Sequence, residues 1–102
     1  MPATRYHLAA LVTTASPSAI RPILERLVAP HRGVLRPTEG GFEVETIVEG
    51  EDARSINRQL LSEMRRVERH TQIRSEFVTD RGAHERFFDY VPKGSGRPAP
   101  PP

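Results

Sequence analysis

The amino-acid sequence predicts an α+β fold in which two helices cover one face of a four-stranded antiparallel sheet. Strand-like and helix-like apolar patterns follow one another in the order β-α-β-β-α-β within roughly eighty residues. The strand-like segments alternate with a period of two, whereas the helix-like segments repeat every three or four residues. This order is that of the ferredoxin-like two-layer sandwich, which serves enzymes, sensors, RNA binders and oligomerisation modules alike.

The first strand is expected at residues 5–13, which read RYHLAALVT. Its length and apolar content favour a central position in the sheet. Alternation gives one face with Tyr6, Leu8, Ala10 and Val12, and an opposite face with His7, Ala9 and Leu11.

A helix is expected next, starting at Ser16 and Pro17 or at Ser18, because serine caps helices and proline is tolerated in the first turn. Pro22 removes a backbone donor, and we expect it either to kink this helix or to mark its true start. The apolar stripe consists of Ile20, Ile23, Leu24, Leu27 and Val28.

The second and third strands are expected to form a hairpin. Residues 34–37 are short and contain Pro37, which favours an edge strand, and residues 38–41 supply a glycine turn. Residues 42–49 alternate well. One face carries Phe42, Val44, Thr46 and Val48, and the other carries Glu43, Glu45, Ile47 and Glu49.

The second helix is expected at about residues 52–69, with Asp52 as the N-cap. Its predicted buried stripe is Ala53, Ile56, Leu60, Met64 and Val67. The fourth strand is expected at residues 72–79, so that residues 1–82 make up the ferredoxin-like domain.

Two further segments follow the predicted domain. Residues 83–91 are expected to form an aromatic C-terminal arm or an extra strand, and residues 92–102 are expected to form a disordered tail, because they are rich in proline and glycine. Phe87, Phe88 and Tyr90 are expensive to leave in water, so they are expected to pack on their own domain or to anchor an interface with another chain.

Composition excludes several classes of protein. The chain has 102 residues and no cysteine, which rules out disulfides and thiolate chemistry. Its four histidines have no metal-ligand spacing, so we expect no metal and no cofactor. No apolar run is long enough to span a membrane, and the N-terminus lacks the pattern of a signal peptide, which favours a cytoplasmic location.

The outer face of the predicted sheet is the candidate site. In the strand order 4-1-3-2, the first and third strands are central, which places His7 near the third-strand carboxylates and near Arg74. The residues expected to face a small ligand or a partner are His7, Glu43, Glu45 and Arg74. The alternative is a solvated face held by cross-strand charge pairs.

Residues 34–78 resemble the ligand-binding domain of the leucine-responsive regulator family, and more loosely ACT domains. The turn TEGGFE, an apolar strand and EGEDARSINRQLLSEMRRVERHTQIRSEFV carry the resemblance, with Gly41, Asp52, Val67 and Thr71 at the corresponding places. The resemblance implies a ferredoxin-like fold, dimers or larger assemblies, and a small ligand such as an amino acid at an interface. It does not include the DNA-binding domain of that family.

The expected function is therefore a non-catalytic small-ligand-binding or assembly module that acts as a homodimer or larger homo-oligomer. The first alternative is RNA binding by the open sheet and its arginines, although the net charge of only +2 does not favour nucleic acid. The second is a dimeric α+β barrel enzyme that uses His7, paired with Glu45, in acid–base catalysis.

Overall fold

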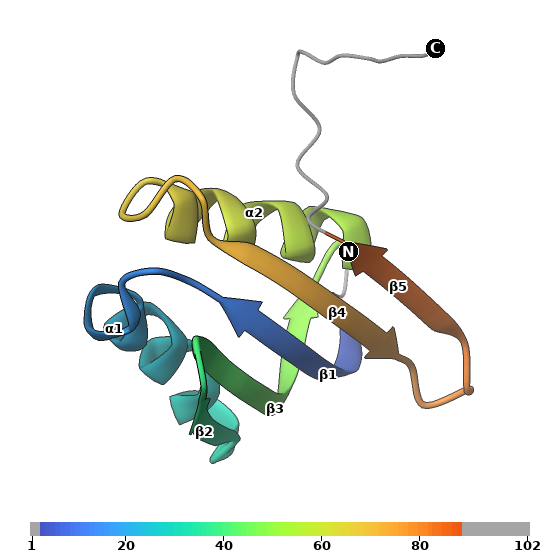
Figure 1. The fold of residues 1–102 in the computed structure, drawn as a ribbon. Coiled ribbons are helices and arrows are strands. Elements are labelled where there is room, and N and C mark those ends of the chain that lie inside the picture. The colour runs from blue at the N-terminus through green and yellow to red at the C-terminus, as the bar shows by residue number, and fades with distance from the viewer. Residues whose placement is uncertain (1–2, 89–102) are drawn as a thin grey trace, which may run out of the picture.

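Two layers make up the fold, which a computed structural model describes for residues 3–88 (Figure 1). Two helices pack on one face of a five-stranded antiparallel sheet, so the α+β class is confirmed and the strand count exceeds the predicted four. The elements are β1 (Thr4–Thr13), α1 (Pro17–Val28), a short 3-10 turn (Ala29–His31), β2 (Val34–Thr38), β3 (Gly41–Gly50), α2 (Ala53–Arg65), β4 (Gln72–Val78) and β5 (His84–Phe88).

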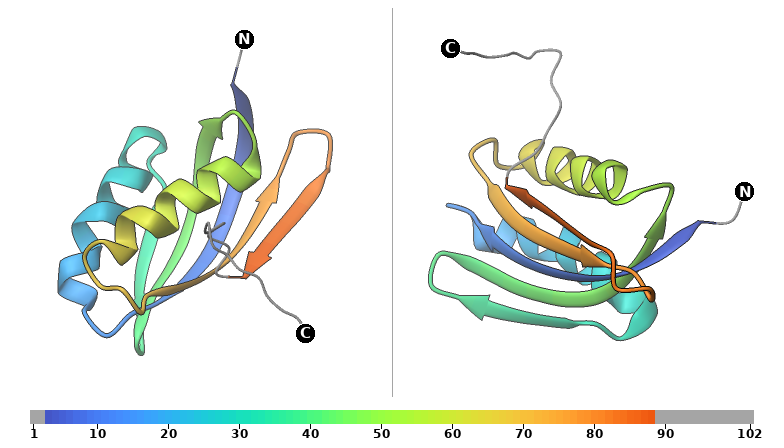
Figure 2. Two further views of the ribbon diagram at one scale, coloured as in Figure 1. Left: turned by 90° about the horizontal axis from the view of Figure 1, so that it is seen from above. Right: turned by 90° about the vertical axis from the view of Figure 1, so that its right-hand side faces the viewer.

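The strands lie in the order β2-β3-β1-β4-β5, and every neighbouring pair is antiparallel. The first four strands thus have the predicted 4-1-3-2 order, with β1 and β3 inside the sheet and β2 at an edge. Both helices lie on the same side of the sheet, where α1 packs on β2 and β3, and α2 packs on β3, β4 and β5 (Figure 2). Within residues 3–88 no helix lies on the other side of the sheet (Figure 2).

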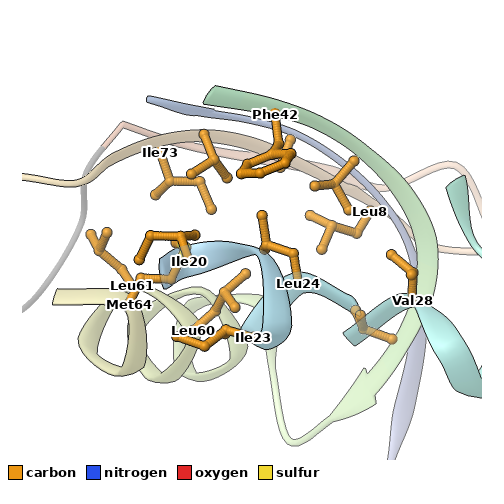
Figure 3. Close-up of a cluster of buried hydrophobic side chains, with 14 of the residues drawn as sticks. Leu8, Ile20, Ile23, Leu24, Val28, Phe42, Leu60, Leu61, Met64 and Ile73 are labelled. Atoms are coloured by element: carbon orange, nitrogen blue, oxygen red, sulfur yellow. The ribbon is translucent and has the colours of Figure 1, made fainter. Parts of the chain in front are cut away.

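Alternation in β1 and β3 sets which side chains enter the core. The even-numbered residues of both strands point toward the helices, as the sequence predicts, and the odd-numbered residues point away from them. From the helices, Ile20, Leu24, Leu61 and Met64 reach the same layer as Leu8, Phe42 and Ile73 of the sheet (Figure 3). Burial of this apolar layer is the main stabilising term of the fold.

The helix starts follow the capping residues of the sequence. Ser16 precedes α1, with Pro17 in its first turn, and Pro22 lies inside the helix at an exposed position rather than at its start. Asp52 caps α2, because its Oδ1 accepts a hydrogen bond of 2.7 Å from the backbone N–H of Ser55.

The prediction for the C-terminal end of α2 is wrong. The helix ends at Arg65 rather than near residue 69, and Val67, predicted to be buried, is 51% exposed. The chain turns here because Thr71 is fully buried, and its hydroxyl donates to Thr14 Oγ1 at 3.1 Å. Arg65 Nε also donates to the Thr71 carbonyl oxygen at 2.8 Å, which closes the turn.

The aromatic segment after residue 82 supplies an extra strand, β5, which pairs with β4. Phe87 points to the helix side and packs against the core, with its ring 5.7 Å from that of Phe77. Phe88 points to the opposite side and is 66% exposed. Tyr90 and the predicted tail at residues 92–102 lie outside the described residues.

Candidate functional site

The side of the sheet without helices is the candidate site, and we call it the open face. It consists of the outward-pointing residues of the five strands, which the register of the ladders arranges in rows. The central row contains Arg36, Glu43, Leu11, Arg74 and Phe88, in order from β2 to β5. The next row contains Val34, Glu45, Ala9, Glu76 and Arg86, and the third contains Ile47, His7, Val78 and His84.

Exposed apolar side chains gather on the open face. Within residues 3–88 the exposed large hydrophobic residues are Leu11, Val34, Val67 and Phe88, at 47%, 41%, 51% and 66%. All but Val67 belong to the open face, and Leu11 and Phe88 lie in the same row. Single exposed apolar residues are ordinary, but several on one uncovered sheet face indicate an interaction surface.

Ion pairs link the charged residues of the open face both within its rows and between neighbouring rows. Arg36 Nε donates to Glu43 at 2.9 Å, and another nitrogen of Arg36 lies 3.8 Å from Glu45. At the other edge, Glu76 Oε2 lies 2.6 Å from His84 Nδ1 and 3.5 Å from Arg86 Nε. These pairs are solvent-exposed, so each contributes little to stability on its own.

The charges of the open face cancel. Its arginines are Arg5, Arg36, Arg74 and Arg86, and its glutamates are Glu43, Glu45, Glu49 and Glu76. A phosphate backbone is bound by an excess of positive charge, which this face lacks. A neutral face of mixed sign is better suited to a protein surface that carries the same mixture.

A shallow hollow of about 270 Å³ lies in the middle of the open face. Ala9, Leu11 and Phe88 are among the residues that line it. The Arg74 guanidinium lies over the Phe88 ring, 5.3 Å from its centroid, a cation–π contact that holds both side chains at the rim. The hollow exists because Ala9 is small while its neighbours across the ladders, Glu45 and Glu76, are long.

The structure brings some of the predicted site residues together and separates others. Glu43 and Arg74 flank Leu11 on either side, so these two predicted residues share a row. Glu45 lies one row below, beside Ala9. His7 lies in the third row between Ile47 and Val78, and it lines a second hollow of about 370 Å³ together with Glu45, although within residues 3–88 no hydrogen bond joins the two side chains.

Other residues of the site were not predicted. Arg86 and His84 reach the open face only because β5 pairs with β4, and the sequence left an arm as an equal alternative to a strand. Polar and aromatic residues do not alternate in HERFF, so no periodic signal in the sequence indicates that His84, Arg86 and Phe88 share a face. Arg36 was not assigned to this face, because it lies next to Pro37 in a strand too short to show a clear alternation.

A larger hollow of about 880 Å³ lies on the other side of the molecule, between the helices and the end of β3. Its charged lining residues are Arg26, Arg58, Arg66, Glu49, Glu51 and Glu63. Arg26 is ion-paired with Glu63 at 3.7 Å. Because the two signs balance here too, this groove shows no preference for an anion or a cation.

Glu76 has a lowered pKa. The hydrogen bond with His84 is the largest cause, Arg86 adds to it, and partial desolvation acts in the opposite direction against the ordinary value of 4.5. A carboxylate with a lowered pKa stabilises the fold above its unfolded pKa, and this contribution is lost as the pH falls through the folded pKa.

Glu76→Gln is therefore expected to lower the urea midpoint at neutral pH and to have no effect at a pH well below the lowered folded pKa of Glu76, where the carboxyl is protonated in both the folded and the unfolded chain. Urea unfolding of both proteins at the two pH values measures this. An equal loss at both would show that Glu76 acts through packing rather than through its charge.

The described part of the chain brings no three potential metal ligands together. None of the helices in residues 3–88 is long and apolar enough to span a bilayer. No family model, no curated protein and no solved structure matches this chain.

Proposed function

We propose that this chain is a cytoplasmic, non-catalytic assembly module of ferredoxin-like fold, which forms a homodimer through its open face and holds any small ligand in the cleft between the subunits. The observation that carries the proposal is the position of Leu11, Val34 and Phe88, the exposed large hydrophobic residues on the side without helices. The resemblance to the ligand-binding domain of the leucine-responsive regulator family agrees with it.

The two alternatives have less support on the open face. RNA binding would use Phe88 as a stacking platform, but the equal numbers of arginines and glutamates remove the attraction for a phosphate backbone. An acid–base mechanism needs His7 within hydrogen-bond reach of its partner, and His7 has apolar neighbours on both ladders.

Phe88 is the aromatic anchor of the proposed interface. Phe87 already packs on the core of its own chain, which leaves Phe88 as the aromatic residue of β5 that a partner can cover. Buried aromatic residues at the centre of an interface carry much of its binding energy. Tyr90, which shares the parity of Phe88 in the sequence, belongs to the same expectation.

The proposal predicts that wild-type protein is dimeric and that Leu11→Glu and the double change Phe88→Ala with Tyr90→Ala each weaken the dimer by at least about tenfold. The matched control is Val67→Glu, since Val67 is just as exposed but lies away from the open face. Sedimentation velocity over a concentration series measures the dissociation constants, and circular dichroism confirms that each variant is folded.

A wild-type monomer at every concentration would overturn the proposal, and so would a dimer that Leu11→Glu leaves unchanged. If a monomer instead bound single-stranded RNA with an affinity that fell steeply with salt, the RNA alternative would replace it.

A further inference from the structure

We infer that two copies pair through their open faces about a two-fold axis. The axis lies between the two sheets, runs parallel to the rows and crosses β1 midway between Ala9 and Leu11. In this arrangement Leu11 of each subunit packs over the partner's Ala9. The inference rests on the proposed homodimer and adds the register in which the two faces meet, together with the residue pairs that define it.

Shape is the first argument for this register. Leu11 and Ala9 both line the hollow, but Leu11, which is 47% exposed, carries the longer side chain, whereas the small Ala9, two residues away on the same strand, leaves space above it. A two-fold interface must be complementary to itself, so a protrusion and a hollow must be exchanged by the axis. An axis midway between the two residues does this, and facing sheets pack best where large residues meet small ones.

Charge is the second argument. The same half turn places the row of Leu11 over the row of Ala9, so on β4 Arg74 faces the partner's Glu76. On β5 it places the Phe88 ring over the partner's Arg86, a cation–π arrangement. Because β4 is adjacent to β1, about 4.8 Å away, the Arg74 contact stays close to the axis even though packed sheets are rotated by about 30°.

The unfavourable contact of this register lies on β3, where Glu43 faces the partner's Glu45. Both carboxylates already have Arg36 of their own subunit as a partner, at 2.9 Å and 3.8 Å. The repulsion between them is therefore reduced by a counter-charge that is present before the subunits meet.

A second register is the competitor. An axis along β1 would place Leu11 on Leu11 and Ala9 on Ala9, which leaves the hollow unfilled. It would also oppose Glu45 to the partner's Glu76, but it would pair Arg74 with the partner's Glu43. Arg74 thus meets Glu76 in one register and Glu43 in the other, and this difference can be tested.

The test uses charge-reversed subunits mixed in pairs. Arg74→Glu alone and Glu76→Arg alone are each expected to weaken the homodimer by at least about tenfold. Mixed together, they are expected to form a heterodimer with an affinity within about threefold of wild type, because one of the two contacts between positions 74 and 76 keeps its native charges and the other is restored with its signs exchanged. Native mass spectrometry distinguishes the heterodimer by mass, and Arg81→Glu in the β4–β5 turn is the control for charge reversal away from the face.

A heterodimer from Arg74→Glu with Glu43→Arg, and none from Arg74→Glu with Glu76→Arg, would overturn this register and keep the dimer. Rescue by neither mixture, with a dimeric wild type, would overturn it as well. A monomeric wild type would instead overturn the proposed function on which the inference rests.

Discussion

Phe77→Ala is expected to lower the free energy of unfolding by about 3–5 kcal/mol, the loss measured when a buried phenylalanine is truncated. Phe77 is fully buried on β4, with its ring edge-to-face against Tyr6 at 5.6 Å and against Phe87 at 5.7 Å. It therefore joins the central strand β1 to the last strand β5. Its removal leaves a cavity that these two rings cannot fill without moving the strands.

Urea unfolding measures the loss, and hydrogen exchange locates it. The amides of β5 are expected to lose protection before those of β1, because Phe87 holds β5 to the core through Phe77. Val67→Ala is the control, since it truncates an exposed apolar side chain that lies away from the open face and should cost about 0.5 kcal/mol or less. A loss for Phe77→Ala no larger than that of the control would show that the aromatic cluster does not hold β5.

The strands β1 and β3 could be predicted almost to the residue because each buries only one face. In such strands apolar residues alternate with polar or small ones along the sequence. This alternation separates an inner from an outer set in residues 6–12 and 42–48. The same alternation identified the outer residues His7, Glu43 and Glu45 without any knowledge of the rows.

The buried face of α2 could not be predicted in the same way. Asn57 is fully buried there because Ser75 of β4 donates a 2.6 Å hydrogen bond to its Oδ1. A polar residue in a core position is satisfied by a partner 18 residues away, and this pairing leaves no periodic signal. Of the predicted stripe, Ala53, Leu60 and Met64 are buried, Ile56 packs partly buried against the core, and Val67 is exposed. Asn57 and Leu61 also enter the core but do not belong to that stripe.

The rows of the open face depend on long-range pairing in the same way. Leu11 and Arg74 are far apart in the sequence, and they lie side by side only because β1 pairs with β4 in this register. The sequence alone does not predict this register. The hollow at Ala9 likewise requires Glu45 and Glu76 to arrive from two different strands. Residue types on the face were readable from the sequence, whereas their order across it was not.

Gly41→Ala is expected to destabilise the protein by about 3 kcal/mol or more, at the upper end of what overpacking costs. Gly41 is buried at the first position of β3, opposite Thr13 of β1. A Cβ on Gly41 would fall on the carbonyl of Val12, which is backbone and cannot turn aside as a flexible side chain can. The two central strands would have to separate, and the rows of the open face would shift with them.

Gly40→Ala separates this steric effect from the conformational freedom of glycine. Gly40 has a φ of +84° in the β2–β3 turn, but a Cβ there would meet nothing within 4 Å. Its substitution should cost about 1–2 kcal/mol, the penalty for an L-residue in the left-handed region. Urea unfolding of both variants gives the comparison. A larger loss at Gly40 than at Gly41 would mean that the turn, rather than the close approach of β3 to β1, fixes the register from which the open face is built.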